Sequence, residues 1–330
     1  MRPFDYERAT DVAQAVTLVA ERPEARFLGG GTNLVDLVRR GVETPDRLID
    51  VTGLPLTEVE ATQDGGVRVG AVVTNADLAH HPLVRSHYPL LSQAVLAGAS
   101  GQLRTMATVG GNLLQRTRCP YFTDLTMACN KRVPGSGCAA REGFTRYAAV
   151  LGTSEQCIAA HASDMAVALA ALDARVELTS AHRVREVAVT DLYRLPGETP
   201  HLETVVSRGE LITAVVLPPP PRGPSRYRKV RDRASYAFAL VSVAAVLGVE
   251  DGRVTILRLG LGGIAPKPWR AAAAETLLVG SEPTDEAFTA AIDLELADAK
   301  PLSGNAFKVD LTRRTVVAVL RRLRDEAVTT

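Results

Sequence analysis

Apolar residues in the N-terminal part of the chain follow the periods of both helices and strands. Residues 11–21 carry apolar side chains around one helical face and predict a first helix. Residues 25–28 form a short extended run that stops at a glycine triplet, 29–31, and helical spacing resumes over 35–40. Residues 47–51 predict a second strand, parallel to the first. After its first helix, the chain is therefore predicted to form strand, glycine turn, helix and strand.

The rest of the chain alternates strand-like and helix-like segments and divides at a run of four prolines, 218–221. Prolines cannot extend a sheet, so this run predicts a linker and a domain boundary. Strands are predicted at 65–71, 175–179, 187–190, 211–217 and 254–261, with a further apolar segment at 239–247. Helices are predicted to begin near 74 and to cover 90–99, 165–172, 284–299 and 312–327. The pattern predicts an α+β protein with a small C-terminal α+β domain.

Composition excludes several classes of function. The 330 residues are 46% hydrophobic and 23% charged, which is enough apolar material for two domains with real cores. The 38 Lys and Arg residues nearly balance the 37 Asp and Glu residues, and a net charge of +1 gives no electrostatic footprint for nucleic acid or an anionic membrane. Neither a signal peptide nor a membrane span is expected. We therefore expect a globular protein with no nucleic-acid or membrane partner, whose compartment stays open.

Two glycine turns are candidate phosphate sites. The triplet at 29–31 ends a predicted strand, so backbone N–H groups and the following helix N-terminus could approach a phosphate. It matches neither the dinucleotide fingerprint G-x-G-x-x-G nor a P-loop, and a glycine triplet alone is more often a turn without a ligand. The segment 108–112, Thr-Val-Gly-Gly-Asn, repeats the same chemistry. Two such turns in one domain favour a dinucleotide held at both phosphates.

All four cysteines fall within one segment that is rich in glycine, proline and arginine. They are Cys119, Cys129, Cys138 and Cys157. Disulfides fit poorly with a chain of this size that has no export signal. Thiolates on a loop flanked by cations suit an iron–sulfur cluster, while structural zinc usually shows Cys-x-x-Cys pairs, and none occurs here. From the residues alone, an iron–sulfur cluster, zinc and buried free thiols all stay open.

Three ordered motifs, at 27–34, 108–112 and 161–169, resemble the FAD-binding medium subunit of the molybdenum hydroxylases, the family of xanthine dehydrogenase, carbon monoxide dehydrogenase and aldehyde oxidoreductase. The resemblance extends over nearly the whole chain. It implies a first domain, 1–221, made of two α/β subdomains, about 1–54 and 55–221, of the FAD-binding type. A C-terminal α+β domain would occupy 222–330. The cysteine loop, 115–157, is similar to that of heterotrimeric bacterial aldehyde oxidoreductases, whose flavoprotein subunit carries a [4Fe–4S] cluster.

The resemblance also assigns residues to FAD and to the cluster. Asp164 would bind sugar hydroxyls of FAD, although it lies at a helix start that Ser163 could cap equally well. Lys229, in a basic stretch that could instead be a solvated strand edge, is a further candidate contact. The residues implied at FAD are Phe27, Leu28, Gly29, Gly30, Gly31, Thr32, Asn33, Leu34, Thr108, Gly111, Asn112, Asp164 and Lys229. Those implied at the [4Fe–4S] cluster are Cys119, Cys129, Cys138 and Cys157.

The function that the resemblance implies is electron transfer, with no catalytic residue in this chain. A large molybdenum-cofactor subunit would oxidise an aldehyde or a related substrate, and a small subunit with two [2Fe–2S] clusters would pass electrons to FAD here, for release to an external acceptor. Two alternatives remain: a stand-alone FAD-dependent oxidase or dehydrogenase, and a non-enzymatic metal-bearing scaffold. The substrate and the acceptor are not encoded in these motifs.

Overall fold

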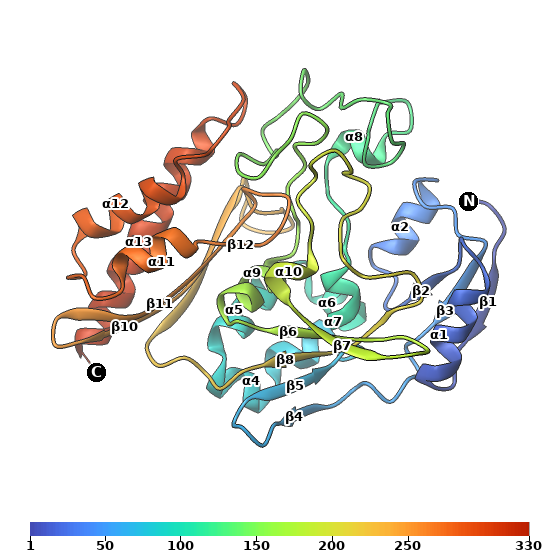
Figure 1. Ribbon diagram of the computed structural model, residues 1–330, viewed down its shortest axis with the longest axis horizontal. Coiled ribbons are helices and arrows are strands. Elements are labelled where there is room, and N and C mark those ends of the chain that lie inside the picture. Colours follow the sequence, from blue (N-terminus) through green and yellow to red (C-terminus); the bar gives the residue numbers. More distant parts are fainter. Residues whose placement is uncertain (330) are drawn as a thin grey trace.

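Three sheets organise the chain and follow one another across the molecule (Figure 1). The computed structural model describes residues 1–329, with side chains up to residue 327. In Figure 1 the N-terminal sheet lies on the right, the C-terminal domain lies on the left, and a third sheet with its helices lies between them. None of the described helices is long and apolar enough to cross a membrane. The architecture is α+β, as the sequence predicted.

The N-terminal sheet has three parallel strands in the order β1–β3–β2. β1 (Asp5–Arg8) and β2 (Arg26–Leu28) both pair with β3 (Arg47–Asp50), and α1 (Val12–Glu21) and α2 (Leu34–Arg39) connect the strands. The predicted parallel arrangement of β2 and β3 is confirmed. The sequence did not predict β1, because three of its four side chains are exposed and it shows no apolar alternation.

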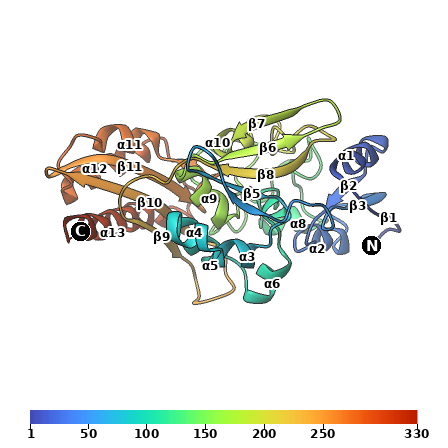
Figure 2. The same cartoon turned by 90° about the horizontal axis from the view of Figure 1, so that it is seen from below.

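The middle sheet has five antiparallel strands in the order β4–β5–β8–β6–β7. Helices α3 to α6 lie on one side of it (Figure 2). The strands are β4 (Val59–Ala61), β5 (Val67–Gly70), β6 (Arg175–Thr179), β7 (Val184–Ala188) and β8 (Leu211–Leu217). The helices are α3 (Asn75–His80), α4 (Pro82–His87), α5 (Pro89–Ala97), α6 (Gly101–Met106) and α7 (Val109–Leu113).

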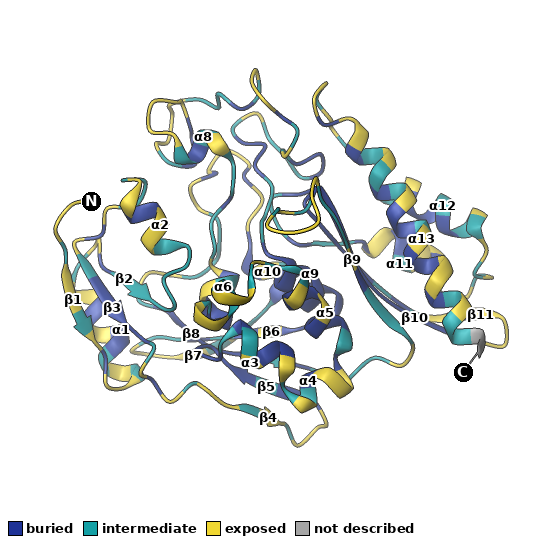
Figure 3. Ribbon diagram, turned by 180° about the vertical axis from the view of Figure 1, so that it is seen from behind, coloured by how far each residue is buried: buried dark blue, intermediate teal, exposed yellow. Residues whose placement is uncertain are grey.

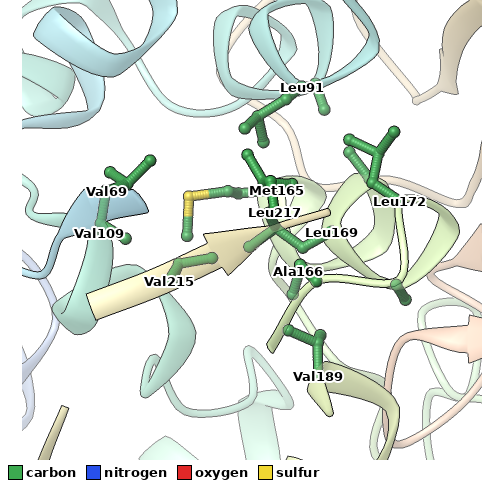
Figure 4. Packing of buried hydrophobic residues seen from close by; sticks show 14 of the residues in the cluster. Val69, Leu91, Val109, Met165, Ala166, Leu169, Leu172, Val189, Val215 and Leu217 are labelled. Carbon is green, nitrogen blue, oxygen red and sulfur yellow. The ribbon is translucent and has the colours of Figure 1, made fainter. Parts of the chain in front are cut away.

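Helix α9 (Asp164–Ala171) lies at the centre of the molecule, and every one of its residues is buried. A helix that is apolar on all sides must be covered all round. Met165, Ala166 and Leu169 pack among side chains of β8 and α5 (Figure 4). On another side, a Cβ added at Gly260 would lie 2.6 Å from the carbonyl oxygen of Val167, so the C-terminal sheet approaches α9 at a glycine. Helix α9 is therefore held between two sheets.

The C-terminal domain is an antiparallel sheet in the order β12–β11–β10–β9, covered by three helices (Figure 1). Its strands are β9 (Ser225–Val230), β10 (Val241–Glu250), β11 (Arg253–Gly262) and β12 (Trp269–Arg270), and its helices are α11 (Ala272–Leu278), α12 (Asp285–Glu295) and α13 (Phe307–Thr329). The sheet and the helices share a second hydrophobic core. The basic stretch noted in the sequence forms β9, the edge strand of this sheet.

The cysteine-bearing segment joins α7 to α9 and contains a single short helix, α8 (Pro120–Thr123). It crosses the top of the molecule in Figure 1 and consists largely of turns (Figures 1 and 3). The sequence predicted a loop here. Most of the segment is intermediate or exposed (Figure 3), and a small cluster of Phe122 and Cys129 with Leu37 anchors it against α2.

Several predicted boundaries differ from the structure. The strand predicted at 187–190 ends at Ala188, and α10 (Val189–Leu192) follows it. The helix predicted to run to residue 99 ends before Gly98, which has extended backbone angles, and Ala99 after it has a positive φ of 51°. Helix α13 begins five residues earlier than predicted. Lys308, in the added first turns of this helix, is fully buried.

Candidate functional site

The first glycine turn follows β2 and leads into α2. Gly31 has a φ of 72°, which glycine adopts without strain. Asn33 lies at the helix N-cap position, and its side-chain oxygen accepts a hydrogen bond from the backbone N–H of Arg116 at 2.8 Å. Its Nδ2 is buried without a partner among the described residues. The turn therefore presents an unused donor, an arrangement that suits a bound acceptor.

The second glycine turn begins helix α7. Thr108 caps this helix, and its Oγ1 accepts a hydrogen bond from the backbone N–H of Gly111 at 3.2 Å. Asn112 is oriented by α9, because the Ser163 hydroxyl donates to its Oδ1 at 2.6 Å. Ser163 also caps α9 by accepting from the backbone N–H of Ala166 at 2.9 Å. The turn is thus tied to the N-terminus of the central helix.

The two turns are in direct contact. A Cβ added at Gly29 would lie 2.8 Å from the Oγ1 of Thr108, and one added at Gly30 would lie 1.6 Å from the carbonyl oxygen of Met106. Neither position can carry a larger residue while the turns stay together. The glycines are therefore required by the close approach of two segments that are about 80 residues apart in the sequence.

Both turns line a cavity of about 560 Å³, the glycine-turn cavity. Leu28 and Asn112 are outside its lining. The predicted residues that do line it are Phe27, Gly29, Gly30, Gly31, Thr32, Asn33, Leu34, Thr108 and Gly111. The structure thus brings most of the residues expected at the cofactor to one hollow, which faces backbone amides and a helix start.

Asp164 and Lys229, predicted from distant motifs, form a buried ion pair. Lys229 Nζ lies 2.8 Å from Asp164 Oδ2, with 4% and 8% of their side chains exposed. The Tyr227 hydroxyl donates to Asp164 Oδ1 at 2.6 Å. Burial and then the Asp164 carboxylate raise the pKa of Tyr227 well above its ordinary value. Asp164 is the first residue of α9 and its cap is Ser163, so the carboxylate keeps lone pairs for another donor.

A second cavity of about 540 Å³, the inter-domain cavity, lies between the cysteine segment, the start of α9 and the C-terminal domain. Asp164 and Ser163 line it, whereas Lys229 does not. Four aromatic residues line it as well: Phe144, Tyr147, Tyr236 and Phe238. Sequence reasoning missed these aromatics, because they are scattered along two loops and share no motif.

Arg118 and His161 also line the inter-domain cavity and were given no role from the sequence. Arg118 Nε and His161 Nε2 are both shielded from solvent without a partner among the described residues. His161 Nδ1 accepts from the backbone N–H of Ser163 at 3.3 Å, so the proton lies on Nε2. Burial lowers the pKa of His161 to about 4, and it is neutral at pH 7. Each residue belongs to a stretch that sequence reasoning had singled out.

The four cysteines are free thiols that line one small cavity of about 10 Å³, the thiol cavity. Cys129 and Cys138 face each other in an antiparallel bridge, and Cys157 Sγ accepts from the backbone N–H of Ala159 at 3.5 Å. Burial raises the pKa of the Cys119 thiol to about 11. Among the residues that the structure describes, no three His, Cys, Asp or Glu side chains are already arranged to hold a metal ion.

A charged network links the thiol cavity to the glycine-turn cavity. Lys131 Nζ donates to Glu203 at 2.8 Å, and Arg116 forms ion pairs with both Glu203 and Glu43. Burial would raise the pKa of Glu203, but the charges of Arg116 and Lys131 outweigh burial and hold this pKa below its ordinary value. Lys131 lines the thiol cavity and Arg116 lines the glycine-turn cavity. The network therefore fixes the position of one cavity relative to the other.

Comparisons with known proteins define the class. Residues 2–220 match the family model described as the FAD binding domain in molybdopterin dehydrogenase, and residues 209–327 match the CO dehydrogenase flavoprotein C-terminal domain. The chain belongs to the FAD-binding medium subunits of the molybdenum hydroxylases, which are oxidoreductases.

Individual relatives fit the same family. The chain is 53% identical to the aldehyde oxidoreductase FAD-binding subunit PaoB of Escherichia coli (strain K12), over 99% of this chain and 100% of the relative. It is 27% identical to the carbon monoxide dehydrogenase medium chain of Afipia carboxidovorans, over 98% and 96%. A chain of quinoline 2-oxidoreductase from Pseudomonas putida 86 has the same fold, with a TM-score of 0.77 and 22% identity over 99% of this chain and 98% of that one.

Proposed function

We propose that this chain is the FAD-carrying and iron–sulfur-carrying subunit of a molybdenum-containing aldehyde oxidoreductase. In this proposal, electrons from an aldehyde oxidised on a large molybdenum subunit pass through [2Fe–2S] clusters of a small subunit to FAD on this chain, and then to an external acceptor. The main support is the meeting of two glycine turns on one cavity, in a chain that is 53% identical to an aldehyde oxidoreductase FAD-binding subunit. FAD would supply the ability to accept and release electrons singly or in pairs.

The chain's own groups would hold FAD by its phosphates and sugar hydroxyls. The backbone N–H groups of the two glycine turns would bind the pyrophosphate, and the unused Asn33 Nδ2 would donate to it. Asp164 has free lone pairs that would accept from a sugar hydroxyl. Lys229 would act indirectly, by holding the Asp164 carboxylate in place, because Lys229 does not line either of the two large cavities. The donor set therefore fits FAD.

The four thiols would ligate a [4Fe–4S] cluster. Cys119, Cys129, Cys138 and Cys157 are reduced and line a common cavity, and the Lys131 ammonium beside them would offset the cluster's negative charge. The same segment is linked to the FAD cavity through Glu203, which would place both redox centres on one support.

The first test is an absorption spectrum of the purified complex, with FAD and iron quantified per chain. A flavin band with a broad iron–sulfur shoulder is expected, together with co-purification of a molybdenum-containing large subunit and a small iron–sulfur subunit. A chain that binds FAD and oxidises a substrate without partners would be a stand-alone oxidoreductase. A colourless chain would refute the proposal.

The cysteine assignment has its own test. In Cys129→Ser, the iron bound per chain should fall by about four atoms, because a [4Fe–4S] cluster needs four thiolates. Val133→Ser is the matched control, since Val133 is 53% exposed on the same loop. Iron at the wild-type level in Cys129→Ser, measured on protein with normal FAD content, would rule out Cys129 as a ligand.

A further inference from the structure

Arg118 carries a positive charge into the inter-domain cavity without a negative partner. It lies between Thr117, which is buried, and Cys119. Its Nε is shielded from solvent and unpaired, and no ion pair among the described residues involves it. The neighbouring arginines differ: Arg116 pairs with Glu43 and Glu203, and Arg141 pairs with Glu155.

Acidic side chains near Arg118 are already occupied. The inter-domain cavity has two, of which Asp164 is held by Lys229 and Tyr227. The other, Asp232, pairs with Arg146 at 2.5 Å and accepts from the Tyr147 hydroxyl at 2.8 Å. Asp36 acts on Arg118 through space but pairs with Arg40 at 3.3 Å. Among the described residues, no carboxylate therefore forms an ion pair with this guanidinium.

Arg118 is half-buried, and because a guanidinium keeps its proton at any ordinary pH, even partial burial without a counter-ion costs stability. The Phe238 ring, 4.9 Å from Arg118 Cζ, offsets part of that cost by a cation–π interaction. Phe238 is itself partly exposed, which weakens such a contact. A negatively charged occupant of the cavity would supply the partner that Arg118 lacks among the described residues.

We propose that Arg118 is a redox-tuning residue, a fixed cation that raises the reduction potential of the flavin ring by stabilising its reduced, anionic form. This inference rests on the proposed function. Two electrons and one proton added to the oxidised ring leave it with one net negative charge, and a nearby cation favours that state. The electrons come from the substrate by way of the partner's clusters, and they leave to the external acceptor.

Two other negative groups could face Arg118, and each makes a different prediction. If the guanidinium bound the FAD pyrophosphate, its removal would weaken FAD binding equally in both redox states and leave the potential unchanged. If it served the cluster ligated by Cys119, the cluster's potential would shift and that of the flavin would not. The position of Arg118 on the cavity that carries Asp164 and the aromatic residues favours the flavin ring.

The experiment measures the flavin midpoint potential by spectroelectrochemistry in the intact complex, with cluster potentials measured by EPR. Arg118→Gln and Arg118→Met should both lower the flavin potential by about 30 mV or more, a tenfold change in the equilibrium constant of a two-electron couple. Arg118→Lys, which keeps the charge, should shift it less. Arg40→Gln is the control, since it removes an equal positive charge nearby. The Arg40 side chain is 53% exposed.

The thermal unfolding midpoint of the FAD-free chain tests whether the substitutions act only by destabilising the fold. Removing a half-buried charge that has no ion-pair partner should leave Arg118→Met as stable as the wild type, or more stable. A flavin potential in Arg118→Gln equal to that of Arg40→Gln, with FAD fully bound, would overturn the inference and leave the proposed function intact. A wild-type chain without FAD would remove the proposed function and this inference together.

Discussion

Gly30 shows how much one residue decides at this site. Its missing side chain allows the first glycine turn to rest against the backbone of Met106, and an added Cβ would lie 1.6 Å from the Met106 carbonyl oxygen. Backbone cannot retreat as a flexible side chain can. The separation of the two turns, and hence the shape of the glycine-turn cavity, therefore depends on this position.

Gly30→Ala should push the two turns apart and weaken FAD binding by about tenfold or more. The measurement is a titration of the FAD-free complex, followed by quenching of flavin fluorescence. Gly101→Ala is the matched control, because a Cβ at Gly101, at the start of α6, meets nothing within 4 Å. Equal FAD affinity in both variants would contradict the close contact of the turns.

At the scale of elements, Lys308 connects α13 to the cysteine-bearing segment and to the turn after β11. It is fully buried, and its Nζ donates to the carbonyl oxygens of Ala148 at 2.9 Å and Gly263 at 2.8 Å. Burial lowers its pKa from 10.5 to about 7. The unfolded chain holds this proton up to about pH 10.5, so between the two values it binds more protons than the folded chain. The free energy of unfolding should therefore rise with pH over that range.

Raising the pH from 7 to 9 should add about 2 kcal/mol of stability from this one group. Lys308→Met should lack this rise, while Lys300→Met, an exposed lysine before the same helix, should keep it. Urea unfolding at pH 7, 8 and 9 gives the comparison. The assignment fails if the wild type and Lys308→Met respond to pH alike.

On the scale of the whole molecule, the Asp164–Lys229 pair joins the two main parts of the chain. Asp164 begins the central helix α9, and Lys229 lies on β9 of the C-terminal sheet. Tyr227, on the same strand, also donates to Asp164. Because the pair is buried, removing one partner leaves an uncompensated charge between the domains.

Lys229→Met should cost about 3–5 kcal/mol of unfolding free energy, since the Asp164 carboxylate would stay buried and unpaired. The double variant Asp164→Asn with Lys229→Met should recover part of that loss, because both charges are then gone. Unfolding of the FAD-free chain measures both. Additive losses in the double variant would mean that the pair is not coupled.

The sequence predicted much of the fold, but few of the contacts that the site residues make with one another. The glycine turns could be recognised in the sequence because no other residue type fits at Gly30 and Gly31. The motifs around them led to the expectation that the chain binds FAD. Arg118 and the cavity aromatics such as Phe238 were missed, since their role depends on which charges and rings lie opposite. The domain boundary at 218–221 and the individual roles of the site residues stay predictions.

The sequence alone determined the local features: the central apolar helix, the glycine turns and the four cysteines in one segment. Each depends on residue type and short-range spacing, which can be read directly from the sequence. The tertiary structure decided which groups meet. It brought Lys229 into contact with Asp164 and left Arg118 without an ion-pair partner among the described residues. Pairing across about 65 residues depends on how the sheets pack around α9 and not on local propensity.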